Sequence, residues 1–111
     1  GATTEKSVVA PQHTEAKISL NYLMIDSWDN ERGYVYVNGA KVFDQQHDAT
    51  FKYSGDGNKK CGQGNWLEGK WDVAWTGAHT AASVVLAVSS NLNSGPDDEA
   101  FGIDNVAIWV R

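Results

Sequence analysis

Carboxylate side chains are concentrated in one short segment early in the chain. Asp26-Ser27-Trp28-Asp29-Asn30-Glu31 places three carboxylates and one amide within six residues, between two apolar runs. Ca²⁺ in proteins is bound by about six to eight oxygen atoms from carboxylates, amides, backbone carbonyls and water. The segment therefore predicts part of a calcium site. It is not an EF-hand loop, because the D-x-[DN]-x-[DN]-G spacing is absent.

A second acidic segment lies near the C-terminal end, at residues 97–99, and is followed by Asp104 and Asn105. Carboxylates gathered without a cation repel one another and lose solvation, which raises their pKa values. We therefore expect the fold to bring the two acidic segments together around Ca²⁺. The alternative is that both segments are solvated turns. The expected metal ligands are Asp26, Asp29, Glu31, Asp98, Glu99 and Asp104.

Tryptophan is abundant, with five residues in 111. Exposed aromatic rings on a β-sandwich can stack on sugar rings while neighbouring amides bind the hydroxyl groups. Trp66 with the adjacent Asn65 follows a glycine-rich loop and is the best-placed candidate, and a core position is the alternative for it. Trp71 and Trp75 share one face of a strand and are expected in the core. The predicted ligand-binding residues are Asn30, Asn65, Trp66 and Asn105.

Other chemistry has little support in the sequence. The three histidines are His13, His47 and His79. None has a Cys or His partner at the spacing of a metal site, so no transition-metal site is expected. Cys61 has no base beside it in the sequence, so a catalytic thiol is not indicated. A hydrolase using Asp29 and Glu99 as acid and base is a weaker alternative, because a domain of this size has little room for a deep cleft. We expect a protein that is not an enzyme.

Composition excludes several classes of function. The 111 residues are enough for one domain, and the formal net charge of −5 argues against binding nucleic acid, whose phosphates require a basic surface. With one cysteine the chain forms no intrachain disulfide. No apolar run approaches the length of about 18–20 residues that a transmembrane helix needs.

Alternating apolar residues predict strands in most of the chain. Residues 17–25 alternate, and two β-branched and aromatic runs flank Asn38-Gly39, the pair favoured in a two-residue type I′ hairpin turn. Residues 71–75 also alternate, and the valines in the apolar run 81–90 favour a strand over a helix.

Residues 101–110 form the last predicted strand, in which regular alternation puts Asp104 on the same face as Ile108. Residues 1–12 form a lead-in segment with one short edge strand. Seven or eight short strands separated by glycine-rich turns predict a single all-β antiparallel sandwich over 1–111, jelly-roll-like, with room for one short helix.

The two acidic segments also carry a resemblance. Ile25-Asp26-Ser27-Trp28-Asp29-Asn30-Glu31, followed by Val35-Tyr36-Val37-Asn38-Gly39, and the closing Asp98-Glu99-Ala100-Phe101-Gly102-Ile103-Asp104-Asn105-Val106, resemble a module of large secreted and surface proteins of bacteria and protists. Pro11-Gln12-His13-Thr14 and Cys61-Gly62 look similar as well, so the resemblance extends from about His13 to Val110.

The resemblance implies an extracellular β-sandwich in adhesin-like multidomain proteins, with the acidic segments as Ca²⁺ ligands and without catalytic residues. It also implies additional sequence at the start of the module, so the first strand of the sandwich is expected to be missing or supplied elsewhere.

Together these features predict a calcium-binding, non-catalytic module for adhesion or carbohydrate recognition. The expected location is extracellular or at the cell surface, where calcium is abundant enough to fill a weak site. The expected partner is a glycan or a cell-surface or matrix protein, and the module is expected to be part of a larger multidomain protein. The alternative is a structural spacer domain in which Ca²⁺ only rigidifies the fold.

Overall fold

The alternating segments fold into seven antiparallel strands in two sheets. The computed structural model describes residues 3–26, 28–48, 69–92 and 99–111, and within these ranges it contains no helix. The strands are β1 (Thr4–Val9), β2 (Glu15–Asp26), β3 (Asp29–Val37), β4 (Ala40–Asp48), β5 (Gly69–Ala78), β6 (Ser83–Ser90) and β7 (Glu99–Val110).

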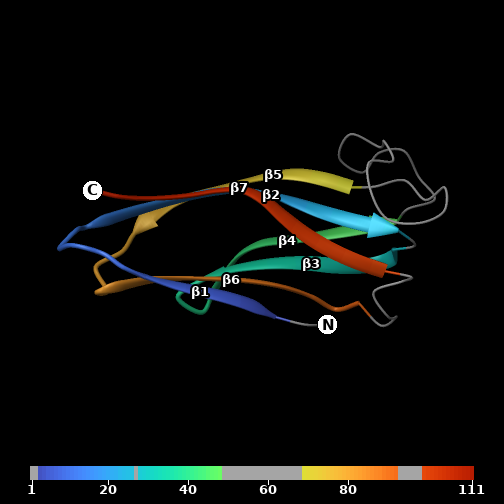
Figure 1. Ribbon diagram of the computed structural model, residues 1–111, viewed down its shortest axis with the longest axis horizontal. Coiled ribbons are helices and arrows are strands. Elements are labelled where there is room, and N and C mark those ends of the chain that lie inside the picture. The colour runs from blue at the N-terminus through green and yellow to red at the C-terminus, as the bar shows by residue number, and fades with distance from the viewer. Residues whose placement is uncertain (1–2, 27, 49–68, 93–98) are drawn as a thin grey trace.

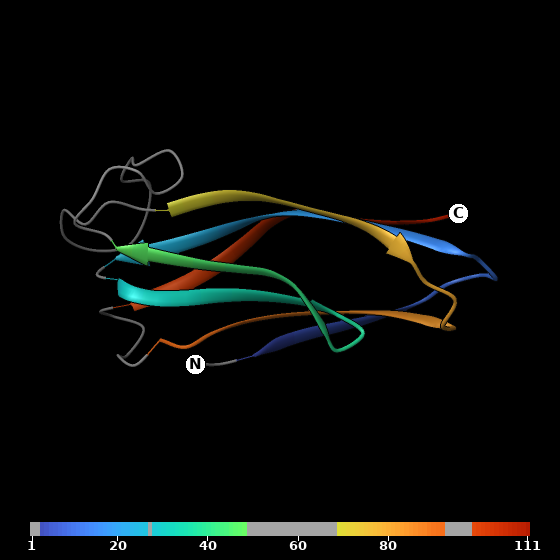
Figure 2. The same cartoon turned by 180° about the vertical axis from the view of Figure 1, so that it is seen from behind.

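The two sheets stack as the layers of a sandwich. The four-stranded sheet has the order β1-β6-β3-β4, and the three-stranded sheet has the order β5-β2-β7. Figure 1 shows β5, β2 and β7 in one layer and the other four strands in the second, and Figure 2 shows the same layers from behind. The predicted all-β antiparallel sandwich is confirmed, including the lead-in strand β1 at a sheet edge and a strand rather than a helix after residue 81.

The strand pairs are nested in the manner of a jelly roll. Along the sequence, the pair β3–β4 is enclosed by the pair β2–β5, and that pair is enclosed by the pair β1–β6. Such nesting results when one long antiparallel ladder rolls up into two sheets. Within the described residues β7 pairs only with β2, so its other edge is unpaired there. Residues of β7 also line an apolar depression of about 430 Å³ together with residues of β1 and β6, and its lining includes Val8, Leu86, Ile103, Val106 and Ile108.

The core lies between the sheets and follows the period of two expected for strands. Every second residue of β2 is buried, and β3 and β6 present matching rows from the other sheet. The largest fully buried side chains include Trp28 and Tyr22. Trp71 and Trp75 pack against this core, as predicted. None of the described elements is a helix with the length and hydrophobicity required to cross a bilayer.

The turn between β3 and β4 forms as its sequence predicts. Asn38 has a φ of 46° and Gly39 a φ of 84°, so both central residues adopt the left-handed conformation that a type I′ turn requires. Asn and Gly tolerate this conformation better than other residues do. The hairpin prediction is confirmed.

Strand β7 does not alternate regularly, which corrects one prediction. Ala107 pairs with Ser19 while Asp104 pairs with Asn21, so two residues of β7 stand opposite one residue of β2. This is a β-bulge, and Asn105 within it has a φ of 54°. The bulge shifts the phase of the strand, so Asp104 and Ile108 lie on opposite faces rather than on the same one.

Candidate functional site

The two acidic segments meet at one end of the sandwich. The backbones of Asp26 and Glu99 are direct partners in the pairing of β2 with β7. Next to this pair, the indole Nε1 of the buried Trp28 donates a hydrogen bond of 2.8 Å to the carbonyl oxygen of Ala100. The backbone therefore brings together two segments that are more than 70 residues apart in the sequence.

Two of the predicted metal ligands are close neighbours at the start of β3. The Asp29 backbone N–H donates to Glu31 Oε2 over 2.5 Å, and Glu31 is buried with an exposed fraction of 6%. The pKa of the Asp29 carboxyl is raised, first by its hydrogen-bonding contact with Glu31 and then by the negative charge of Glu31, with a smaller contribution from Asp48. A bound cation would offset this repulsion, so the residues at this position fit Ca²⁺.

The remaining predicted ligands do not all join this end. Asp104 lies opposite Asn21, five residues along β2 from Asp26, and five residues of a strand span about 16 Å. Asp98 lies outside the described residues. Among the residues that are described, no group of three or more His, Cys, Asp or Glu side chains is arranged to hold a metal ion. The calcium site thus stays a prediction, with Asp29 and Glu31 beside the Asp26–Glu99 backbone pair.

Calcium should stabilise the protein through Asp29 and not through Asp104. Ca²⁺ at about ten times its Kd would add about 1.4 kcal/mol to the free energy of unfolding, which corresponds to a rise in Tm of about 5 °C or more. Differential scanning calorimetry with Ca²⁺ and with EDTA measures this shift. We expect Asp29→Asn to abolish the shift and Asp104→Asn to retain it.

The raised pKa of Asp29 makes the free energy of unfolding depend on pH. Without calcium the folded state binds this proton more tightly than the unfolded state, so stability falls as the pH rises above the ordinary carboxylate range. Binding of Ca²⁺ should release the proton and reverse that trend. An equal calcium shift in the Asp29→Asn variant would contradict the predicted site.

A second set of chemically active side chains lies on the outer face of the three-stranded sheet. The register of β7, β2 and β5 arranges this face in rows across the strands. One row is Trp109–Lys17–Thr76, the next is Ala107–Ser19–Ala74, and the third is Asp104–Asn21–Asp72. An aromatic row and a polar row therefore flank a row of small side chains, with about 6.6 Å between successive rows.

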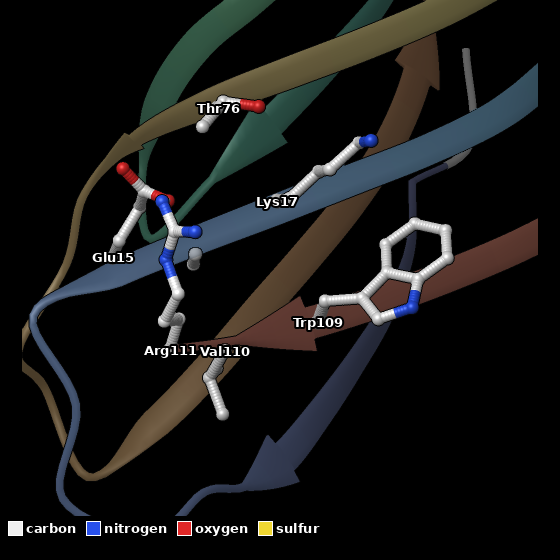
Figure 3. Close-up of a pocket in the computed structure, with 7 residues that line it drawn as sticks. Glu15, Lys17, Thr76, Trp109, Val110 and Arg111 are labelled. Atoms are coloured by element: carbon white, nitrogen blue, oxygen red, sulfur yellow. The ribbon is translucent and has the colours of Figure 1, made fainter.

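Trp109 stands in a shallow depression at one end of this face. Its side chain is 51% exposed, and Lys17 Nζ lies 5.3 Å from the centroid of its ring. The depression has a volume of about 450 Å³, and Glu15 and Arg111 line it and form an ion pair of 2.8 Å. Figure 3 shows Trp109, Lys17 and Thr76 rising from three neighbouring strands, with Arg111 meeting Glu15. An aromatic surface is thus surrounded by hydrogen-bond donors and acceptors.

Asn105, next to Asp104 in the bulge of β7, joins the polar row and links its amide and carboxylate groups. Asn105 Nδ2 donates to Asn21 Oδ1 over 2.7 Å, and Asn21 Nδ2 in turn donates to Asp72 Oδ1. The bulge in β7 makes this chain of bonds possible, because the left-handed conformation of Asn105 turns its amide toward β2. The outer face therefore holds fixed polar groups at one end and an exposed tryptophan at the other.

The predicted ligand-binding residues are distributed unevenly. Asn105 lies on the outer face, whereas Asn30 occupies a left-handed position in β3, where its carbonyl accepts a bond from Gln46 Nε2. Asn65 and Trp66 lie outside the described residues.

Sequence reasoning missed Trp109 and Lys17 as candidate site residues. The signal that could have found them is the polar set Lys17, Ser19 and Asn21, which alternates with the buried residues of β2.

Comparisons with protein-family models, curated proteins and solved structures return no match to this chain.

Proposed function

We propose that the protein is a non-catalytic carbohydrate-binding module that binds sugar on the outer face of the three-stranded sheet. The observation that carries this proposal is the half-exposed Trp109 in a depression beside Lys17, Glu15 and Arg111. A module of this kind acts in adhesion, at the cell surface or outside the cell, within a larger protein. Ca²⁺ at the acidic end stabilises the fold, away from the sugar.

The chemistry of this face matches the chemistry of a sugar. A pyranose ring has an apolar C–H face that packs on an aromatic ring, and its hydroxyl groups both donate and accept hydrogen bonds. Trp109 supplies the apolar surface, the Lys17 ammonium supplies a donor, and the Glu15 carboxylate supplies an acceptor. The row between Trp109 and the amides consists of the small side chains Ala107, Ser19 and Ala74, and we place a second sugar ring over it.

The outer face of the other sheet offers a weaker version of this arrangement. Lys41 Nζ lies 5.1 Å from the centroid of the Tyr34 ring, which resembles the contact between Lys17 and Trp109. The lysine there is itself paired, because Asp44 binds Lys41 at 2.9 Å as well as Arg32 at 2.6 Å, whereas Lys17 forms no ion pair within the described residues. These ion pairs hold the pKa of the Asp44 carboxyl below its ordinary value. Tyr34 therefore provides a matched control for Trp109.

Replacing Trp109 by alanine should reduce affinity for the sugar by about tenfold or more, because truncating a central aromatic residue typically costs above 1.4 kcal/mol. A glycan array with the wild type identifies the sugar, and titration calorimetry with that sugar measures the variants. Tyr34→Ala should bind as the wild type does. Neither variant should change the calcium-induced rise in Tm.

Three results would count against the proposal. Loss of binding in Tyr34→Ala but not in Trp109→Ala would place the site on the other sheet. Retention of wild-type affinity in both variants would exclude both aromatic faces. Absence of binding to any glycan, together with a calcium-raised Tm, would favour the alternative of a structural spacer domain.

A further inference from the structure

Two buried histidines form a direct pair at the end of the sandwich opposite the acidic segments. His13 lies between β1 and β2, and His79 follows β5. Their exposed fractions are 6% and 8%, and His13 Nε2 lies 2.7 Å from His79 Nδ1. The rings are inclined by only 14°, with centroids 5.0 Å apart. One hydrogen bond therefore joins the two imidazoles.

The outer nitrogens of the pair both face oxygen atoms. His13 Nδ1 lies 2.6 Å from the carbonyl oxygen of Pro11, and His79 Nε2 lies 2.9 Å from Asn38 Oδ1. The orientation of the Asn38 amide is fixed by the backbone. Its Oδ1 accepts a bond of 2.9 Å from the Val85 N–H, and its Nδ2 donates a bond of 3.1 Å to the Ser83 carbonyl.

Counting protons along this chain of bonds gives a definite charge. Carbonyl oxygens only accept, so His13 Nδ1 and His79 Nε2 must each carry a proton to bond to Pro11 and Asn38. The bond between the two rings requires a third proton. Two neutral imidazoles carry only two protons in total. Both rings neutral would leave two acceptors facing each other in a buried place, which is costly.

We propose that His13 and His79 form a proton-binding site, an imidazole–imidazolium pair that holds one extra proton in the folded protein. The proton joins the β1–β2 connection, the end of β5 and the β3–β4 turn, and so ties both sheets together at this end. Loss of the proton breaks one of the three bonds. The function proposed above does not depend on this site.

No other charged group on the neighbouring elements accounts for the pair. Glu15 at the start of β2 is two residues from His13, and Arg111 after β7 accepts a backbone hydrogen bond of 3.0 Å from the Thr14 N–H. The Glu15 and Arg111 side chains pair with each other at 2.8 Å. The β3–β4 turn and β6 contribute the Asn38 amide and the backbone of Ser83 and Val85. In the described residues, no hydrogen bond or ion pair joins a charged side chain to either imidazole.

A fixed proton count predicts how stability depends on pH. An unfolded chain holds two protons on these imidazoles above about pH 7.5 and four below about pH 5.5, because free imidazole titrates near 6.5. The chain of hydrogen bonds in the folded state requires three protons, one more than the unfolded chain holds at the upper end of this range, so stability is expected to fall as the pH rises there.

Long-range ¹H–¹⁵N NMR of the wild-type protein at about pH 7.5 tests the proposal directly. We expect both outer nitrogens, His13 Nδ1 and His79 Nε2, to be protonated, with a third proton between the rings. An unprotonated nitrogen at either outer position would overturn the proposal. This measurement needs no variant.

Equilibrium unfolding provides the second test, using His79→Gln and the control Glu5→Gln, at an exposed position of β1 outside the proposed sugar site. Between about pH 7.5 and 8.5 the folding constant of the wild type, relative to that of His79→Gln, should fall about tenfold, as expected for one bound proton. Glu5→Gln should show the same pH dependence as the wild type. A ratio that does not change with pH would overturn the proposal. If His79→Gln does not fold, the proton count from NMR decides alone.

Discussion

Replacing Trp28 by alanine should lower the free energy of unfolding by about 3–5 kcal/mol, the usual cost of truncating a buried aromatic residue. Trp28 is 1% exposed and is among the largest fully buried side chains. Its ring lies edge-on to His47 at a centroid distance of 6.0 Å, and its indole N–H donates a hydrogen bond to the Ala100 carbonyl oxygen. Alanine would remove the packing and the bond together.

Trp28→Phe separates these two contributions. Phenylalanine keeps an aromatic ring in the core but leaves the Ala100 carbonyl without its indole donor, so a loss of about 1–3 kcal/mol is expected. Urea denaturation followed by circular dichroism measures both variants, because removing a tryptophan alters the fluorescence signal. Trp28→Ala should also weaken calcium binding, since the ring holds the second acidic segment against the first. A loss below about 1 kcal/mol in Trp28→Ala would show that the ring has little part in the core.

Local patterns predicted the strands well because alternation and turn chemistry are short-range properties. The alternating residues of β2 and the Asn38-Gly39 turn are encoded within a few positions of one another. The convergence of the two acidic segments depends on which strands pair, and that is not a local property. The backbone pairing of Asp26 with Glu99 brings the two segments together. Asp104 could not be placed correctly, since a bulge at Asn105 leaves no clear signal in an alternating run.

The histidine pair was beyond local reasoning for a different reason. His13 and His79 are 66 residues apart and lie in connections between strands, where no periodicity indicates which side chains will meet. Trp109 was visible in the sequence, but its proposed role depends on Lys17 and Thr76 from the two neighbouring strands, whose register had to be known first. Sites assembled across strands therefore require the fold before their members can be recognised.

The second large effect is expected from Gly33→Ala, because Gly33 lies against the ring of Tyr22. A Cβ atom at this position would stand 2.6 Å from Tyr22 Cε1 and Cζ and 2.7 Å from Oη. The ring has no room to move. It is fully buried, stacks on Phe101 at a centroid distance of 5.5 Å, and donates from its hydroxyl to the Ser89 carbonyl at 2.7 Å. Burial also raises the pKa of this hydroxyl, so it remains a donor at physiological pH.

We therefore expect Gly33→Ala to lower the free energy of unfolding by about 1–3 kcal/mol through overpacking. Gly102→Ala is the matched control in a strand of the other sheet, since the nearest atoms to its added Cβ are 4.0 Å away, and it should change stability by less than about 0.5 kcal/mol. In a Tyr22→Leu background the cost of Gly33→Ala should largely disappear, and a double-mutant cycle measures this coupling. Equal stabilities of Gly33→Ala and Gly102→Ala would contradict the argument, because the added methyl group would then have met no rigid ring.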